Sequence, residues 1–109
     1  HHDGRLAAIV EVNCETDFVA RTADFTQFCR EVAMQVAAMS PQYLRREELP
    51  SNGGHSAEDA KALCLLEQPC VKDQGTTVSD MLKALIAKTG ENVVIRRFAR
   101  FAVGESGGA

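Results

Sequence analysis

The chain has 109 residues, of which 45% are hydrophobic and 25% charged, a balance typical of one soluble globular domain over residues 1–109. Its formal net charge of -3 and pI of about 5.6 argue against non-specific nucleic-acid binding, which needs a basic surface. No apolar run approaches the roughly 18 residues that a membrane span requires, and no basic-then-apolar secretory signal opens the chain. We therefore expect no nucleic-acid or membrane partner, whereas a protein partner stays open.

The four cysteines, Cys14, Cys29, Cys64 and Cys70, form no C-x-x-C pair, which argues against a zinc ribbon. Cys14 and Cys29 lie in apolar patterns, where a free cysteine behaves as a small hydrophobe. We predict buried, reduced thiols and no metal or cofactor, with a disulfide or metal role as the lesser alternative. Reduced thiols favour a cytosolic or organelle-matrix location.

The chain opens with a turn signal, because both positions of Asp3-Gly4 tolerate the positive φ of a two-residue hairpin turn. Residues 5–14 then alternate with period two, which predicts a strand. A hairpin turn needs a strand on each side, so we expect a first strand that is missing from this chain. A frayed chain start is the alternative.

A short helical turn is expected near Thr16, with Asp17 favourable at its N-terminal end. A long helix follows, with Thr22 as its N-cap. Ser40-Pro41 ends this helix, since the residue before a proline avoids the α region. The apolar stripe of the long helix comprises Phe25, Phe28, Cys29, Val32, Val36 and Met39.

Loops and a short helix occupy the middle of the chain. Residues 50–56 form the clearest loop, residues 57–66 predict a short helix, and residues 69–76 form a further connection.

A second well-defined helix is predicted for residues 78–88. Thr77 with Asp80 resembles a capping box at its start, and Gly90 is a suitable C-cap. The stripe of this helix comprises Val78, Met81, Leu82, Leu85 and Ile86.

The last element, residues 92–103, is rich in β-branched and aromatic side chains and predicts a strand. Alternation places Val94 and Phe98 on one face, and Ile95 and Phe101 on the other. A sheet covered by helices on one side has a polar second face, so these two apolar residues indicate that a partner sheet covers that face. The element order, strand-strand-helices-strand with the first strand missing, predicts an α+β fold of two layers, a small antiparallel sheet packed on helices.

No known catalytic or nucleotide-binding motif is present, since G-x-x-x-x-G-K-[ST], G-x-G-x-x-G and H-E-x-x-H are all missing from the sequence. A Cys-His nucleophile built from Cys64 and His55 would lack a third group to orient it. We therefore predict no catalytic residues and no bond chemistry.

Two charge clusters have a functional and a structural interpretation. Glu11, Glu15 and Asp17 can act as acid and base only within a cleft, so solvated charge at a strand end and a helix start is favoured. The three arginines of the last strand can grip phosphate, but surface ion pairs are the favoured interpretation. These arginines are Arg96, Arg97 and Arg100.

Four blocks, in order, resemble one protein family. Residues 10–21 (VEVNCETDFVAR) look like the signature of elongation factor Ts, and residues 31–39 (EVAMQVAAM) match the family's next helix. Residues 65–73 contain a later block, and residues 90–98 (GENVVIRRF) match the last strand. The chain therefore resembles the core, or dimerisation, domain of that family. Bacterial cytoplasm, organelle matrix or stroma is the location that the resemblance implies.

The resemblance implies a function that no pattern above reveals. The family's partner is elongation factor Tu, a GTPase, from which the family promotes release of GDP. The motif that pushes into this partner matches Thr16, Asp17, Phe18 and Val19, with Asp17 and Phe18 carrying the exchange function. From the residues alone, Phe18 as a core residue and Asp17 as a helix-start charge remain the alternative.

Three departures from the family pattern matter. The family's N-terminal helical module and the first strand are absent, and the stretch around residues 51–60 is a shortened loop. Residues 104–109 are expected to be a flexible tail. A dimerisation module without exchange activity is therefore a rival function. A homodimer formed through the sheet, with Val94 and Phe98 in its interface, is expected in either case.

Overall fold

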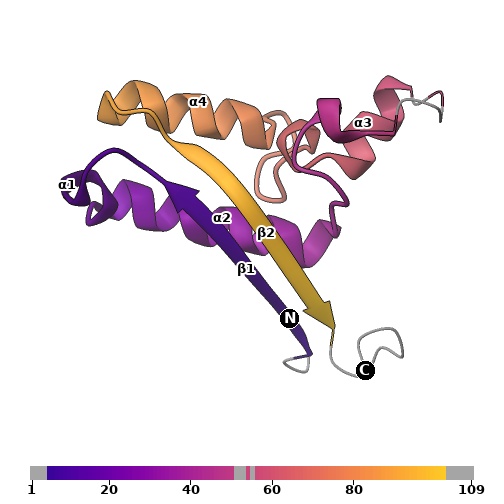
Figure 1. Cartoon of the computed structure of the whole chain (residues 1–109), viewed down its shortest axis with the longest axis horizontal. Coiled ribbons are helices and arrows are strands. Elements are labelled where there is room, and N and C mark those ends of the chain that lie inside the picture. Colours follow the sequence, from indigo (N-terminus) through magenta and orange to yellow (C-terminus); the bar gives the residue numbers. More distant parts are fainter. Residues whose placement is uncertain (1–4, 51–53, 55, 103–109) are drawn as a thin grey trace.

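The structure is a computed structural model that describes residues 5–50, 54 and 56–102. Figure 1 shows the two strands side by side, crossing the long central helix, and the order of elements confirms the predicted α+β class. The turn expected at Asp3-Gly4 and the tail at 104–109 lie outside the described residues. The elements are β1 (Leu6–Asn13), α1 (Asp17–Ala20), α2 (Ala23–Met39), the 3-10 turn η2 (Arg46–Glu48), α3 (Ala57–Leu63), the 3-10 turn η4 (Leu65–Glu67), α4 (Val78–Thr89) and β2 (Val94–Ala102).

β1 and β2 pair antiparallel, with one irregularity in the middle of the ribbon. Glu11 lies opposite Arg97, whereas the next residue, Val12, lies opposite Ile95. Arg96 is therefore an extra residue on β2, the arrangement of a β-bulge. The side chains beyond this point are shifted by one position relative to strict alternation.

Because of the bulge, the residues of β2 that follow Arg96 exchange their inward and outward positions relative to strict alternation. Ile95 is buried, and Phe98, three residues later, packs against the same core. Ala99 and Phe101 are exposed on the opposite, outer face together with Val94. The prediction that Val94 and Phe98 share a face is therefore wrong, because alternation fails where one strand carries an extra residue.

α2 begins where the sequence predicts, because the Thr22 hydroxyl oxygen accepts the backbone N–H of Phe25 at 3.2 Å. It ends at Ser40, which takes a left-handed conformation (φ 51) and donates its N–H to the Val36 carbonyl at 3.0 Å. Met39 is 49% exposed, so the buried stripe stops one turn earlier than predicted. The buried members of that stripe are Phe25, Phe28, Val32 and Val36.

α4 confirms its predicted signals. The Thr77 hydroxyl oxygen accepts the N–H of Asp80, and the Asp80 carboxylate accepts the N–H of Thr77, both at 3.1 Å. Gly90 closes the helix in the left-handed region at φ 73, where a residue without a side chain is least strained.

α3 begins at the residue predicted for the short helix of 57–66 but ends earlier than predicted. Ser56 and Asp59 exchange the same pair of bonds at 3.0 and 3.2 Å, so α3 starts at Ala57, within the loop predicted for 51–60. The helix predicted for 57–66 ends at Leu63, because Cys64 is extended and the chain then makes the separate turn η4.

Two amide side chains lie inside the core, an arrangement that the apolar patterns do not predict. Gln35 is 2% exposed and Gln68 is 1% exposed. Gln35 Nε2 donates to Gln68 Oε1 and to the Pro69 carbonyl, and its Oε1 accepts the Val71 N–H, all at 3.0 Å. Gln68 Nε2 donates to the Ala62 carbonyl at 2.9 Å. These bonds hold α2 against the loop before α4 and leave no polar atom of either amide without a partner.

All four cysteines are free, and Cys64 and Cys70 are buried while Cys14 and Cys29 are half-buried. Burial raises the pKa of the Cys29, Cys64 and Cys70 thiols, which keeps them protonated near neutral pH. No group of His, Cys, Asp or Glu in the described part of the chain could hold a metal ion. None of the helices described is long and apolar enough to cross a membrane.

Candidate partner-binding site

α1 is a single four-residue turn that confirms the helical start expected near Thr16. Thr16 is its N-cap, in extended conformation, and its hydroxyl oxygen accepts the N–H of Val19 at 3.2 Å. The Thr16 carbonyl accepts the N–H of Ala20, also at 3.2 Å, which closes the turn. The four residues of the predicted partner-binding motif are therefore the cap and the first three positions of one helical turn.

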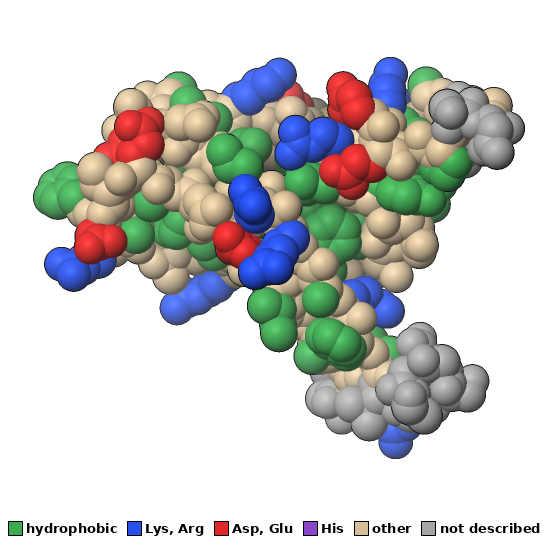
Figure 2. Space-filling view, viewed as in Figure 1, with side chains coloured by type: hydrophobic (Ala, Val, Ile, Leu, Met, Phe, Trp, Pro, Cys, Tyr) green, Lys and Arg blue, Asp and Glu red, His purple; other side chains and the backbone are tan. Residues whose placement is uncertain are grey.

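Phe18 and Val19 are neighbours with opposite environments. Phe18 is 82% exposed, whereas Val19 is 5% exposed and belongs to the hydrophobic core. Successive helix positions point about 100° apart, so the burial of Val19 turns Phe18 toward solvent. Figure 2 shows hydrophobic surface protruding at the end of the molecule where α1 lies. The interpretation of Phe18 as a core residue is therefore wrong.

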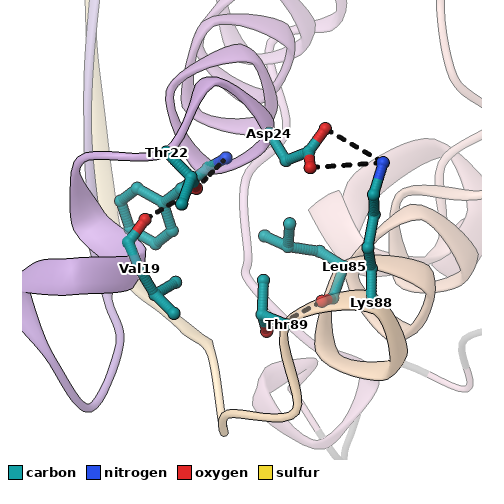
Figure 3. Close-up of polar contacts among 7 residues, drawn as sticks. Val19, Thr22, Asp24, Leu85, Lys88 and Thr89 are labelled. Atoms are coloured by element: carbon teal, nitrogen blue, oxygen red, sulfur yellow. Dashed lines mark hydrogen bonds and ion pairs between the residues drawn. The ribbon is translucent and has the colours of Figure 1, made fainter.

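The corner between α1 and α2 is fixed by one threonine, as Figure 3 shows. Thr22 Oγ1 donates to the Val19 carbonyl at 2.7 Å and accepts from the N–H of Phe25 at 3.2 Å. One hydroxyl thus ends the first helix and starts the second. On the other side of the same corner, Lys88 of α4 lies 3.2 Å from the Asp24 carboxylate.

The predicted carboxylate cluster does not come together as a pair of acid and base. Glu11 accepts a hydrogen bond from Arg97 Nε at 2.6 Å on the outer face of the sheet. This bond, with a second from Asn13, holds the pKa of the Glu11 carboxyl below its ordinary value of 4.5. Glu15 accepts the N–H of Asn92 at 2.6 Å instead. The structural interpretation of this cluster is therefore the better one.

The three arginines of β2 also have separate roles. Arg97 forms the ion pair just described, as the favoured interpretation predicts. Arg100 faces the helices, where its Nε donates to the Ala37 carbonyl of α2 at 3.0 Å. Arg96 is the exposed extra residue of the bulge. The three side chains therefore do not share one face, and no phosphate grip forms from them.

Of the proposed Cys-His nucleophile, only Cys64 lies in the described part of the chain. It is fully buried, and burial raises the pKa of its thiol, which opposes formation of a thiolate.

A second exposed apolar region lies on the outer face of the sheet. Ile9 on β1 is 65% exposed and Phe101 on β2 is 58% exposed, and Ala99 lies opposite Ile9. They line a shallow hollow of about 340 Å³ together with Phe98 and the Glu11–Arg97 pair. Figure 2 shows hydrophobic side chains over part of this ribbon, next to basic and acidic ones.

The sequence did not predict the contacts that Glu15 and Glu91 make beside the site. Glu91 and Glu15 bind the segments before α1 and after α4 to each other, although the sequence places them about 75 positions apart. No local pattern points to this contact, because neither glutamate sits at a cap or on an apolar stripe.

Comparison with known proteins identifies the family. The family model described as Elongation factor TS matches residues 1–62. Elongation factor Ts of Heliobacterium modesticaldum is 40% identical, over 96% of this chain and 61% of that protein. The proteins of the same name from Carboxydothermus hydrogenoformans and Methylacidiphilum infernorum are each 43% identical, over 96% of this chain and 61% and 65% of their own lengths.

The chain therefore spans about three fifths of the length of the first of these relatives. The alignment with the Heliobacterium protein runs over 132 positions although the chain has 109 residues, so that relative has additional residues inside the aligned region. A family model that matches more than half of the chain, together with relatives at 40% identity or more, shows that the chain belongs to the elongation factor Ts family.

Proposed function

We propose that this chain acts in translation elongation by binding elongation factor Tu and promoting release of its GDP, without bond chemistry of its own. The observation that carries the proposal is Phe18, which is 82% exposed on a helical turn that is anchored by the buried Val19. Membership of the elongation factor Ts family supports it, and the resemblance of residues 10–21 to the family's signature implies this partner.

The chemistry of the exposed pair fits insertion into a protein. A phenyl group is a large apolar anchor, and anchors of this kind in partner pockets commonly contribute about 2 kcal/mol or more to binding. Asp17 precedes Phe18 and is exposed, so its carboxylate is available for hydrogen bonds from partner groups. Thr16 and Val19 act from the side of this chain, one as the cap and one as the core anchor.

Binding alone is sufficient for exchange. GDP is held on its GTPase mainly through its phosphates and the bound magnesium. A protein that binds the nucleotide-free form more tightly than the GDP-bound form weakens GDP binding by the same factor, because coupling between two sites is reciprocal. No catalytic group is needed for this effect.

The test is release of a fluorescent GDP analogue from elongation factor Tu, with and without the chain. We expect the chain to accelerate release, and Phe18→Ala to raise the concentration for half-maximal effect about thirtyfold, the equivalent of about 2 kcal/mol.

Phe101→Ala is the matched control, since it removes an exposed phenyl from the other apolar region and should leave the release curve unchanged. Equal curves for wild type and Phe18→Ala would contradict the proposal.

A second candidate function is self-association through the outer face of the sheet, supported by the exposure of Ile9 and Phe101. The proposed occupant of this face is a second copy of the chain. In a two-fold dimer each copy presents the same patch, so Glu11 of each copy can lie near Arg97 of its neighbour. Val94 lies on this face, whereas Phe98 packs against the core and contributes only to the lining of the hollow.

Sedimentation at tens of micromolar distinguishes the candidates when combined with the release assay. A chain that dimerises and does not accelerate GDP release is a dimerisation module only. A strict monomer at these concentrations would contradict self-association and leave the exchange proposal standing.

We also propose a reducing compartment, either bacterial cytoplasm or an organelle matrix or stroma. The support is that all four cysteines are free, with Cys64 and Cys70 buried.

A further inference from the structure

A network of short contacts joins the segment before α1 to the turn after α4. Glu91 Oε1 accepts the backbone N–H groups of Glu15 and Thr16, each at 3.1 Å. Glu91 Oε2 accepts the hydroxyl of Thr16 at 2.6 Å. In the reverse direction, Glu15 Oε2 accepts the backbone N–H of Asn92 at 2.6 Å. We call these four residues, Glu15, Thr16, Glu91 and Asn92, the Glu91 clasp.

The Glu91 clasp acts directly on the cap of α1. The Thr16 hydroxyl donates to Glu91 and at the same time accepts the N–H of Val19 at 3.2 Å. Glu91 therefore fixes the rotamer of the residue that starts the helical turn carrying Phe18. Figure 1 shows α1 and the end of α4 at the same end of the molecule.

The α4 side of the clasp is itself held by hydrogen bonds and by a buried neighbour. Thr89 Oγ1 donates to the Leu85 carbonyl at 2.9 Å and accepts the Glu91 N–H at 3.2 Å. Gly90 ends α4, and Val93, two residues beyond Glu91, is 2% exposed. The carboxylate is thus held between a helix end and a buried strand residue.

α1 needs such support, because four residues make too short a helix to be stable alone. The Thr16 cap accepts only the N–H of Val19. The N–H groups of Glu15 and Thr16, which precede the turn, are accepted by Glu91. A negative charge beside the start of a helix is also favourable electrostatically.

We propose that Glu91 is a positioning residue for the exchange site: through Thr16 it holds α1 in the conformation that presents Phe18 before the partner arrives. This inference rests on the proposed function. It assigns Glu91 no contact with the partner. Without the clasp, the binding-competent conformation of α1 is a smaller fraction of the population, and the apparent affinity falls by that fraction.

The experiment is GDP release from elongation factor Tu as a function of chain concentration, for wild type and Glu91→Ala. We expect the half-saturating concentration to rise about tenfold while the maximal release rate stays within about a factor of two, because the partner restores the conformation once bound. Glu91→Gln keeps one acceptor oxygen and should lie between the two. In a Phe18→Ala background, Glu91→Ala should have little further effect, because there is no anchor left to position.

Asp80→Ala is the matched control, because Asp80 also accepts the N–H of an N-cap threonine but at the start of α4. It should destabilise the fold without raising the half-saturating concentration. A rise equal to that of Glu91→Ala would overturn the proposal, as would a Glu91→Ala curve identical to wild type or a lower maximal rate at unchanged half-saturation.

Amide hydrogen exchange of the free chain separates failure of the clasp from failure of the proposed function. The amides of Val19, Ala20 and Arg21 bond within α1 and should exchange faster in Glu91→Ala than in wild type or Asp80→Ala. Unchanged exchange there would overturn the clasp in any case. If wild type releases no GDP, the proposed function fails, and this measurement alone decides whether Glu91 holds α1.

Discussion

α1 and the outer face of the sheet each expose a phenylalanine, but on supports of different shape. Phe18 is 82% exposed on a single helical turn at one end of the molecule, and the residue next to it is in the core. Phe101 is 58% exposed near the end of the strand pair, on the same outer face as Ala99 and Ile9. A lone protruding ring suits insertion into a pocket, whereas a broad, shallow apolar surface suits packing against another broad surface. The exposed fraction of a phenylalanine therefore does not by itself tell insertion into a partner's pocket from packing against a second surface.

The largest expected effect contrasts Phe18 with the buried Phe25 at the start of α2. Phe25→Ala should lower the free energy of unfolding by about 3–5 kcal/mol, since it leaves a cavity in the core. Phe18→Ala should change it by less than about 0.5 kcal/mol, as for other surface positions. Urea unfolding of both variants measures this. A comparable loss in Phe18→Ala would mean that the ring supports the fold.

The next effect tests the anchor beneath Phe18. Val19→Ala should lower the free energy of unfolding by about 2 kcal/mol, because two buried methyl groups are lost. Val94→Ala is the control from the outer sheet face, where the side chain is 37% exposed and a smaller change is expected. If both substitutions lower the free energy of unfolding equally, burial of Val19 does not anchor α1.

A third prediction concerns the apolar outer face of the sheet, around Ile9, Ala99 and Phe101. Phe101→Ser should weaken self-association at least about tenfold, equivalent to about 1.4 kcal/mol, while leaving the monomer folded. Phe18→Ser should not change association, because α1 lies away from the ribbon's outer face. Analytical ultracentrifugation over a concentration series measures both. An effect of Phe18→Ser on the dimer would assign both rings to one interface.

The smallest effect is that of the Glu11–Arg97 pair on the outer face. The pair lowers the pKa of Glu11, so its contribution to stability is present above the ordinary pKa of 4.5 and is lost as the pH falls through the lower folded value. The stability difference between wild type and Glu11→Gln should therefore be small and constant around neutral pH, and should be lost in acid once the pH falls below the lowered pKa of Glu11 in the folded state. A difference that grows in acid would contradict this sign.

The starts and ends of the two long helices follow from local patterns in the sequence. Thr22 and Thr77 each cap a helix and Gly90 ends one, as their positions in the sequence predict, and the short turn expected near Thr16 begins there. These predictions succeed because the donor and acceptor of a cap lie about three residues apart, so the information is local. The signature around Phe18 is local in the same sense, and it identified the family before any packing was known.

The tertiary structure decided where side chains point and what holds α1. Arg96 becomes the extra residue of a bulge only when β1 is paired with β2, and this moves Phe98 inward and Phe101 outward. Glu91 meets Thr16 across 75 positions of sequence because the core brings the end of α4 beside the end of β1. Register and long-range contacts depend on the packing of both partners at once, and no pattern within one segment specifies them.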